Sequence, residues 1–180
     1  QLDEIINGTR LTKNELEKRY RINFDDPVLL LIQHPVLIDT ESAYEQMVET
    51  LKAIEHCQIP TIIDLPNIDP GGTEIGKAIQ KYAHLPFVHA EKNIDRETFI
   101  SLLSTVSAIV GNSSCGILEA PSFKLPSINI GIRQRGRFRA SNVIDVNHDK
   151  NQIIEAIQVA LHDKAFHSKL RSCQNPYGDG

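Results

Sequence analysis

The run from Gly111 to Glu119 has the residue types and the spacing of a strand-to-helix turn that binds phosphate. Gly111 permits a tight turn, and Gly116 would let a ligand approach the main chain closely. The free amides at the start of the following helix would face outward, where the positive end of the helix dipole favours an anion. Glu119 lies about one and a half turns into that helix, in reach of ribose hydroxyls beside the phosphates. The polar side chains between the two glycines include those of Asn112, Ser113 and Ser114.

Helix capping is the alternative explanation for this run, because Ser and Asn are frequent N-caps. Capping accounts for the two serines but less well for Gly116 and Glu119. Neither the GxxxxGK[ST] pattern of P-loops nor the GxGxxG pattern of dinucleotide-binding proteins occurs in the chain. Cys115 would lie in the first helical turn, where a thiol pKa can fall. No base is adjacent in the sequence, so we interpret Cys115 as a small packing residue.

Two other segments carry side chains that suit phosphate oxygens. His34 follows the apolar run 28–32, and Pro35 keeps it out of the helical region, so the imidazole is presented at the end of a strand. Arg133 opens a loop with four arginines in seven residues, and guanidinium groups bind phosphate oxygens well. The alternatives are a histidine satisfied within a loop, and a solvated basic loop or an RNA patch. An RNA patch usually has more aromatic residues and a wider basic face.

The bulk composition argues against several classes of protein. The 180 residues carry a net charge of −4, so no global basic field points to nucleic acid or to a membrane surface. The longest apolar run, 28–32, is too short to span a bilayer, and the N-terminus lacks the order of a signal peptide. The three cysteines are far apart, and the histidines lack a metal-binding spacing such as HExxH. We therefore expect a cytoplasmic protein with neither a metal nor a cofactor.

Strands and helices are predicted to alternate along the chain, which is long enough for one well-cored domain. The predicted strands are 28–32, 61–65, 87–89, 108–110, 127–130 and 143–146. The predicted helices are 13–20, with Thr12 and Glu15 as a capping box, 40–56, 74–82, 96–105, 114–123 and 152–162. Because parallel strands need crossovers, which are usually helices, this order predicts an α/β fold with a mainly parallel, doubly wound sheet. Ligands of such folds bind beyond the carboxyl ends of the strands, at the switch point.

Taken in order, these motifs resemble those of the hydrolysing UDP-N-acetylglucosamine 2-epimerases of sialic and related nonulosonic acid biosynthesis. The resemblance covers roughly residues 24 to 180. It rests on 34–35, 66–69, 111–119, 126–131, 133–137 and 177–180. It implies a Rossmann-like three-layer sandwich similar to the C-terminal domain of the GT-B fold.

The resemblance also implies a domain organisation. The chain does not begin with Met and ends on a turn-forming run, so we expect it to be part of a longer protein. Residues 1–22 would lead in from a missing N-terminal domain, and 23–172 would form the UDP-binding domain. Residues 173–180 would be a tail that crosses back to the N-terminal domain.

Individual residues receive roles from the same resemblance. Ser113 and Ser114 would bind the diphosphate, and Glu119 would hold the ribose hydroxyls. His34 and Arg133 would contact the phosphates or help the leaving group depart. The other UDP-binding residues that the resemblance implies are Asn67, near the nucleotide, His89, in a uracil pocket with Val88, and Asn112 and Gly116.

The implied reaction is anti elimination of UDP to a 2-acetamidoglucal, followed by addition of water with inversion at C2. The product would be N-acetylmannosamine or a related 2,4-diacetamido sugar. Because the family's acid/base carboxylates lie largely in the N-terminal domain, we expect the 180 residues alone to bind UDP weakly and to be inactive. The full-length protein would be a homodimer or a larger oligomer. The alternatives are the donor-binding domain of a GT-B glycosyltransferase and a non-enzymatic UDP-sugar-binding domain.

Overall fold

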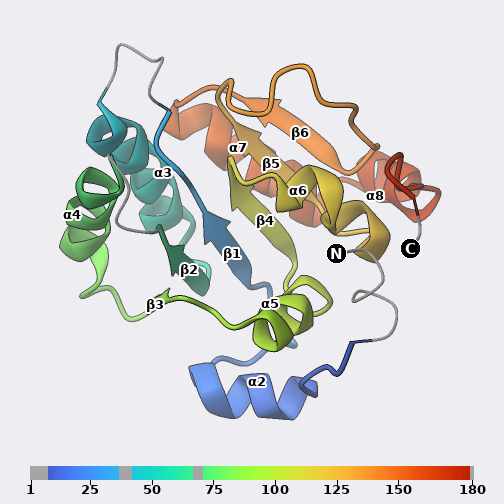
Figure 1. Ribbon diagram of the computed structural model, residues 1–180, viewed down its shortest axis with the longest axis horizontal. Coiled ribbons are helices and arrows are strands. Elements are labelled where there is room, and N and C mark those ends of the chain that lie inside the picture. The colour runs from blue at the N-terminus through green and yellow to red at the C-terminus, as the bar shows by residue number, and fades with distance from the viewer. Residues whose placement is uncertain (1–7, 37–41, 67–70, 179–180) are drawn as a thin grey trace.

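A six-stranded parallel sheet forms the centre of the protein (Figure 1). The computed structural model describes residues 8–36, 42–66 and 71–178. The strand order is β3-β2-β1-β4-β5-β6, and each neighbouring pair is parallel. The strands are β1 (Leu29–Ile32), β2 (Thr61–Leu65), β3 (Val88–Lys92), β4 (Ala108–Gly111), β5 (Ser127–Ile130) and β6 (Val143–Val146). The prediction of an α/β fold with a parallel sheet is confirmed.

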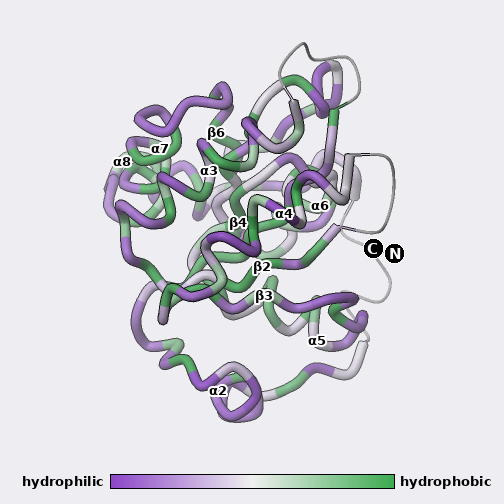
Figure 2. Tube along the Cα trace, turned by 90° about the vertical axis from the view of Figure 1, so that its left-hand side faces the viewer, coloured by the Kyte–Doolittle hydropathy of each residue, from purple (hydrophilic) through white to green (hydrophobic). Residues whose placement is uncertain are grey.

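Helices cover both faces of this sheet and complete a three-layer sandwich. Alternate side chains of a strand point to opposite faces, so Leu29 and Leu31 enter one core while Leu30 and Ile32 enter the other. The first core is closed by α3 (Ala43–Cys57), α4 (Gly72–Tyr82) and α7 (Lys150–His162). The second core is closed by α2 (Lys13–Tyr20), α5 (Arg96–Leu103), α6 (Cys115–Leu118) and the 3-10 helix η1 (Ala120–Phe123). Figure 2 shows the hydrophobic strands inside and the hydrophilic stretches of the helices outside.

Capping residues set where two of the helices begin. The hydroxyl of Thr12 accepts from the amide of Glu15, and the Glu15 carboxylate accepts from the Thr12 amide at 2.7 Å, which confirms the predicted capping box of α2. Ser42 and Glu45 make the same reciprocal pair for α3, which therefore begins at residue 43 rather than at 40. Within the described residues no helix combines the length and the apolar character needed to cross a bilayer.

Two helical segments differ from the prediction. The helix predicted at 114–123 breaks after one turn, because Pro121 has no amide to continue the α-helical ladder. The chain therefore passes through Glu119 from the four-residue α6 into η1. The second difference is α8 (Lys164–Arg171), a helix that was not predicted from the sequence. This short helix is largely exposed and buries only Leu170.

Both ends of the described chain pack on the sheet domain. In the predicted lead-in, Leu16 is fully buried in the second core, and the hydroxyl of Tyr20 donates to Glu91 on β3 at 2.6 Å. In the predicted tail, Nδ2 of Asn175 donates to the carbonyl of Leu118 at 2.9 Å, and the hydroxyl of Tyr177 donates to the carbonyl of Phe138 at 3.1 Å. Both segments thus contact the central domain directly. The division of the chain at residues 22 and 173 stays a prediction.

Candidate functional site

Most of the predicted site residues lie where the order of the strands reverses. From β1 the chain runs outward to β2 and β3, then returns to place β4 on the other side of β1. Register pairs Ile32, the last residue of β1, with Gly111, the last residue of β4. His34 follows β1, Asn112 follows β4 and Arg133 follows β5, so all three lie at the carboxyl edge of adjacent strands. This edge is where doubly wound folds bind their ligands.

Asn112 joins the loop that follows β1 to the turn that follows β4. Its side chain is fully buried: Oδ1 accepts from the amide of His34 at 2.7 Å, and Nδ2 donates to the carbonyl of His34 at 2.8 Å. The side chain was predicted to bind UDP, but its amide is already engaged on both sides by His34. The side chain of Asn112 thus positions His34, and its predicted contact with UDP stays a prediction.

The main-chain carbonyl of Asn112 also anchors the arginine-rich loop. It accepts from Nη1 of Arg133 at 3.1 Å and from Nε2 of the buried Gln134 at 2.8 Å. Partial burial, and next the charge of Arg137, lower the pKa of Arg133. Arg139 forms an ion pair with Asp145 at 2.8 Å. Of the four arginines, Arg133 is therefore the one fixed beside His34 and the turn after β4.

The turn after β4 leaves main-chain amides without partners. Within the described part of the chain, the amides of Ser113 and Ser114 donate no hydrogen bond, and both residues are half-buried. The side chain of Ser114 makes no capping bond, whereas the hydroxyl of Ser113 lies 3.1 Å from the sulfur of Cys115. Two free amides and a free hydroxyl suit an anion. The dipole of a four-residue helix adds little, so the local amides carry the attraction.

The two glycines of the run are required for packing. A Cβ on Gly111, whose φ is +129°, would lie 2.0 Å from the carbonyl oxygen of Ile32. A Cβ on Gly116 would lie 2.2 Å from the hydroxyl oxygen of Ser127 on β5. Gly116 was predicted to let a ligand approach, but its amide bonds to Ser113 and its α-carbon faces the sheet. Its small size is therefore explained by the contact of α6 with β5.

Cys115 lies in the second core and packs as predicted. Burial raises the pKa of its thiol to about 12, so the thiolate is scarce at neutral pH. Cys57, at the end of α3, is only half-buried, and burial raises its pKa as well. We expect a thiol reagent at pH 8 to label Cys57 first and Cys115 only at the rate of unfolding. Mass spectrometry of peptides from timed reactions measures both rates, and fast labelling of Cys115 in the folded protein would contradict its burial.

Glu119 is almost fully buried, with 8% of its surface exposed, at the junction of α6 and η1. Its Oε1 accepts from Nη2 of Arg96 at 2.7 Å. Glu119 was predicted as a site residue, but Arg96 was not, because an ion pair between residues 23 positions apart leaves no local sequence pattern. Asp64 on β2 is a second carboxyl that the sequence did not single out. Burial, and to a smaller extent the charge of Glu91, raise the pKa of Asp64.

One predicted residue that the structure describes, His89, does not join this cluster. His89 lies near the start of the edge strand β3, level with Ile62, and burial lowers its pKa. It lines a separate hollow with Arg19 and Tyr20, so the structure does not bring it to the ends of β1 and β4. Asn67 lies outside the described residues. In the described part of the chain, no group of three or more His, Cys, Asp or Glu side chains could hold a metal ion.

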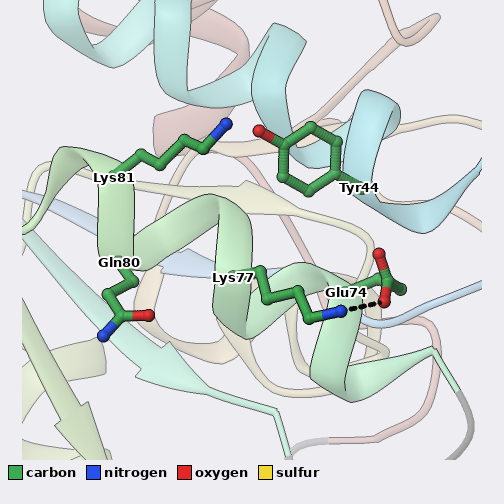
Figure 3. A pocket seen from close by; sticks show the side chains of 5 residues that line it. All are labelled: Tyr44, Glu74, Lys77, Gln80 and Lys81. Carbon is green, nitrogen blue, oxygen red and sulfur yellow. Dashed lines mark hydrogen bonds and ion pairs between the residues drawn. The ribbon is translucent and has the colours of Figure 1, made fainter.

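A groove lies between α3 and α4, away from the cluster (Figure 3). Its volume is about 570 Å³, and it contains none of the predicted site residues. Tyr44 on α3 and Lys81 on α4 point toward each other, with the ammonium 5.1 Å from the ring centre, and Lys77 pairs with Glu74 at 2.9 Å. Lys77 is thus paired with a carboxylate, and Lys81 contacts the ring of Tyr44.

Comparisons with known proteins agree with this fold. The sequence model of a family described as UDP-N-acetylglucosamine 2-epimerase matches residues 1–180. The chain is 36% identical to the UDP-N,N'-diacetylbacillosamine 2-epimerase (hydrolysing) of Legionella pneumophila, covering 99% of this chain and 46% of that protein. It is 32% identical to the GDP/UDP-N,N'-diacetylbacillosamine 2-epimerase (hydrolysing) of Campylobacter jejuni, covering 86% and 41%. The chain thus spans less than half the length of these relatives.

Solved structures show the same arrangement of strands and helices. The structure superposes with a TM-score of 0.78 on the UDP-GlcNAc 2-epimerase of Neisseria meningitidis bound to UDP-GlcNAc, at 22% identity. That match covers 99% of this chain and 49% of the other. A UDP-GlcNAc 2-epimerase of Methanocaldococcus jannaschii in complex with UDP-GlcNAc and UDP gives a TM-score of 0.68 at 20% identity. At these identities the likeness concerns the fold.

Proposed function

Because this chain belongs to the UDP-N-acetylglucosamine 2-epimerase family, we propose that it is the UDP-binding part of a hydrolysing UDP-N-acetylhexosamine 2-epimerase. The observation that carries the proposal is the junction made by Asn112. It fixes His34 and Arg133 beside the free amides of Ser113 and Ser114, at the switch point of the sheet. A compact set of cationic and amide donors suits a diphosphate.

The site would act on the leaving group. Elimination of UDP places negative charge on the departing diphosphate, and donors fixed in advance stabilise that charge without reorganising. Arg133 would contribute a guanidinium, and Ser113 and Ser114 their amides. His34 would contribute an imidazole that hydrogen-bonds to a phosphate oxygen or protonates it as UDP leaves.

The proton chemistry at C2 of the sugar would lie outside this cluster. Anti elimination removes the C2 proton from the face opposite the departing UDP, and inversion on hydration needs a proton delivered at C2. In the proposed protein, carboxylates of a further domain would carry out both steps, and the assembled protein would be a homodimer or a larger oligomer. The 180 residues alone would bind UDP weakly and turn over no substrate.

The substrate class is a UDP-linked 2-acetamido sugar. The names of the two bacterial relatives specify N,N'-diacetylbacillosamine, which favours a 2,4-diacetamido sugar over N-acetylglucosamine as the substrate of the whole protein. A glycosyltransferase with the same fold would need an acceptor. Release of free sugar and UDP in water alone distinguishes the two reactions.

Calorimetric titration of the 180-residue chain with UDP tests the proposal. We expect a dissociation constant in the micromolar to millimolar range, and we expect the double variant S113A/S114A to keep most of this affinity, because the main-chain amides remain. Arg133→Met should weaken binding by about tenfold, since a charge-assisted contact is lost. Arg135→Met, in the same loop but without a contact to Asn112, is the matched control. Equal effects of the two arginine variants, or no UDP binding at millimolar concentration, would refute the proposed site.

A further inference from the structure

The carboxylate of Glu119 is held by one specific partner. Nη2 of Arg96 donates to Oε1 at 2.7 Å, and the two side chains are 40% and 11% exposed, respectively. A carboxylate this buried is costly unless it is paired, so the guanidinium is a condition for placing Glu119 here. Among the described residues the other carboxylate oxygen, Oε2, accepts no hydrogen bond, and the side chain keeps part of its surface exposed. One oxygen is thus anchored, and the other is open to a ligand.

Arg96 itself is fixed in place by α5. It is the first residue of that helix, whose N-cap Asp95 accepts from the amide of Thr98 at 2.9 Å. The guanidinium also lies over the ring of Phe99, 5.8 Å from the ring centre, which restricts its orientation. Arg19 on α2 donates to Thr98 at 3.0 Å and ties the start of α5 to the neighbouring helix. The guanidinium that orients Glu119 therefore belongs to a helix whose first turn is held by these contacts.

We propose that Arg96 is a positioning residue that turns Glu119 so that Oε2 accepts a hydrogen bond from a ribose hydroxyl of the nucleotide. This inference rests on the proposed function, since it concerns the same UDP site. Arg96 acts through Glu119. The guanidinium holds Oε1 and thereby fixes the plane of the carboxylate, which sets the direction from which Oε2 accepts a hydrogen bond. Without Arg96 the carboxylate would rotate toward solvent, and recognition of the ribose would weaken while the contacts to the diphosphate remained.

The ratio of two dissociation constants tests this role. Calorimetry on the 180-residue chain measures binding of UDP and of 2′-deoxy-UDP, which lacks one hydroxyl. We expect the unchanged chain to prefer UDP by roughly tenfold, the value of one hydrogen bond to a charged group. Arg96→Met should reduce this preference to about threefold or less, and Arg96→Lys should restore part of it. Glu119→Gln, which keeps the shape of the side chain, should reduce the preference as Arg96→Met does.

A matched control separates positioning from general stability. Lys77→Met removes an ion pair on α4, which covers the opposite face of the sheet from α5, and should leave the preference for UDP unchanged. Thermal melts of every variant confirm that the protein tested is folded. A preference that survives both Arg96→Met and Arg96→Lys in folded protein would overturn the inference and leave UDP binding intact. UDP binding without any preference over 2′-deoxy-UDP would remove the ribose role of Glu119, and with it that of Arg96. Absence of UDP binding would overturn the proposed function itself.

Discussion

Asn112→Ala is expected to lower the free energy of unfolding by about 3 kcal/mol and to weaken UDP binding by about tenfold. The substitution leaves both the amide and the carbonyl of His34 without the partners they have at 2.7 and 2.8 Å. Each polar group left unsatisfied in a buried place costs about 1–3 kcal/mol. Since His34 then loses its fixed position at the end of β1, the imidazole no longer meets the phosphates in one geometry.

Urea denaturation and calorimetry measure the two effects of Asn112→Ala separately. The matched control is Asn142→Ala, at the opposite edge of the sheet, where the fully buried amide donates to the carbonyls of Gly116 and Leu125. Both variants should lose stability, but only Asn112→Ala should lose affinity for UDP. If Asn142→Ala weakens UDP binding equally, the effect is one of general stability and the positioning role of Asn112 is wrong.

Gly111→Ala should lower the free energy of unfolding by more than about 3 kcal/mol. The backbone at Gly111 has a φ of +129°, a region that residues with a Cβ rarely adopt, and the added carbon would lie 2.0 Å from the carbonyl oxygen of Ile32. That oxygen belongs to the main chain of the central strand β1, so it cannot move aside without breaking the pairing of β1 with β4.

Two other glycines provide controls for Gly111→Ala. Gly136 also has a positive φ, +86°, but no atom lies within 4 Å of its added Cβ, so Gly136→Ala should cost only about 1 kcal/mol. Gly76, inside α4, has neither constraint, and Gly76→Ala should stabilise the helix by about 0.5–1 kcal/mol. Circular dichroism and urea denaturation give the order of stability. A Gly111→Ala variant as stable as Gly136→Ala would contradict the close approach of the two strands.

The fold was predictable because its signals are local. The apolar run 28–32 is continuous since β1 is covered on both faces, and Thr12 with Glu15 marks the start of α2 within four positions. Pro121 is a local signal for the break of the helix at Glu119, although a continuous helix was predicted over 114–123. The short helix α8 buries only Leu170, so the sequence offered few core positions from which to predict it.

The arrangement of the site was predictable only in part. The topology places His34, the 111–119 run and Arg133 at one edge, and alternation of strands and helices was enough to foresee that. The link between Asn112 and His34 spans 78 positions, and the Arg96–Glu119 pair spans 23, so neither leaves a periodic pattern. Position in the run and the family resemblance made Asn112 and Gly116 candidates for ligand contact. In the structure the side chain of Asn112 holds His34, and Gly116 packs α6 on β5. Only the three-dimensional contacts distinguish residues that would bind a ligand from residues that position other side chains or pack one element on another.

Titration of the isotopically labelled 180-residue chain with UDP, followed by amide NMR shifts, tests the central claim most directly. The account predicts that the largest shifts fall on Ser113 and Ser114, with further shifts at His34 and in the loop from Arg133, and that they saturate together. Shifts concentrated around Tyr44 and Lys81 in the groove between α3 and α4, or around His89 at the edge of the sheet, would contradict the assignment of the UDP site to the ends of β1, β4 and β5.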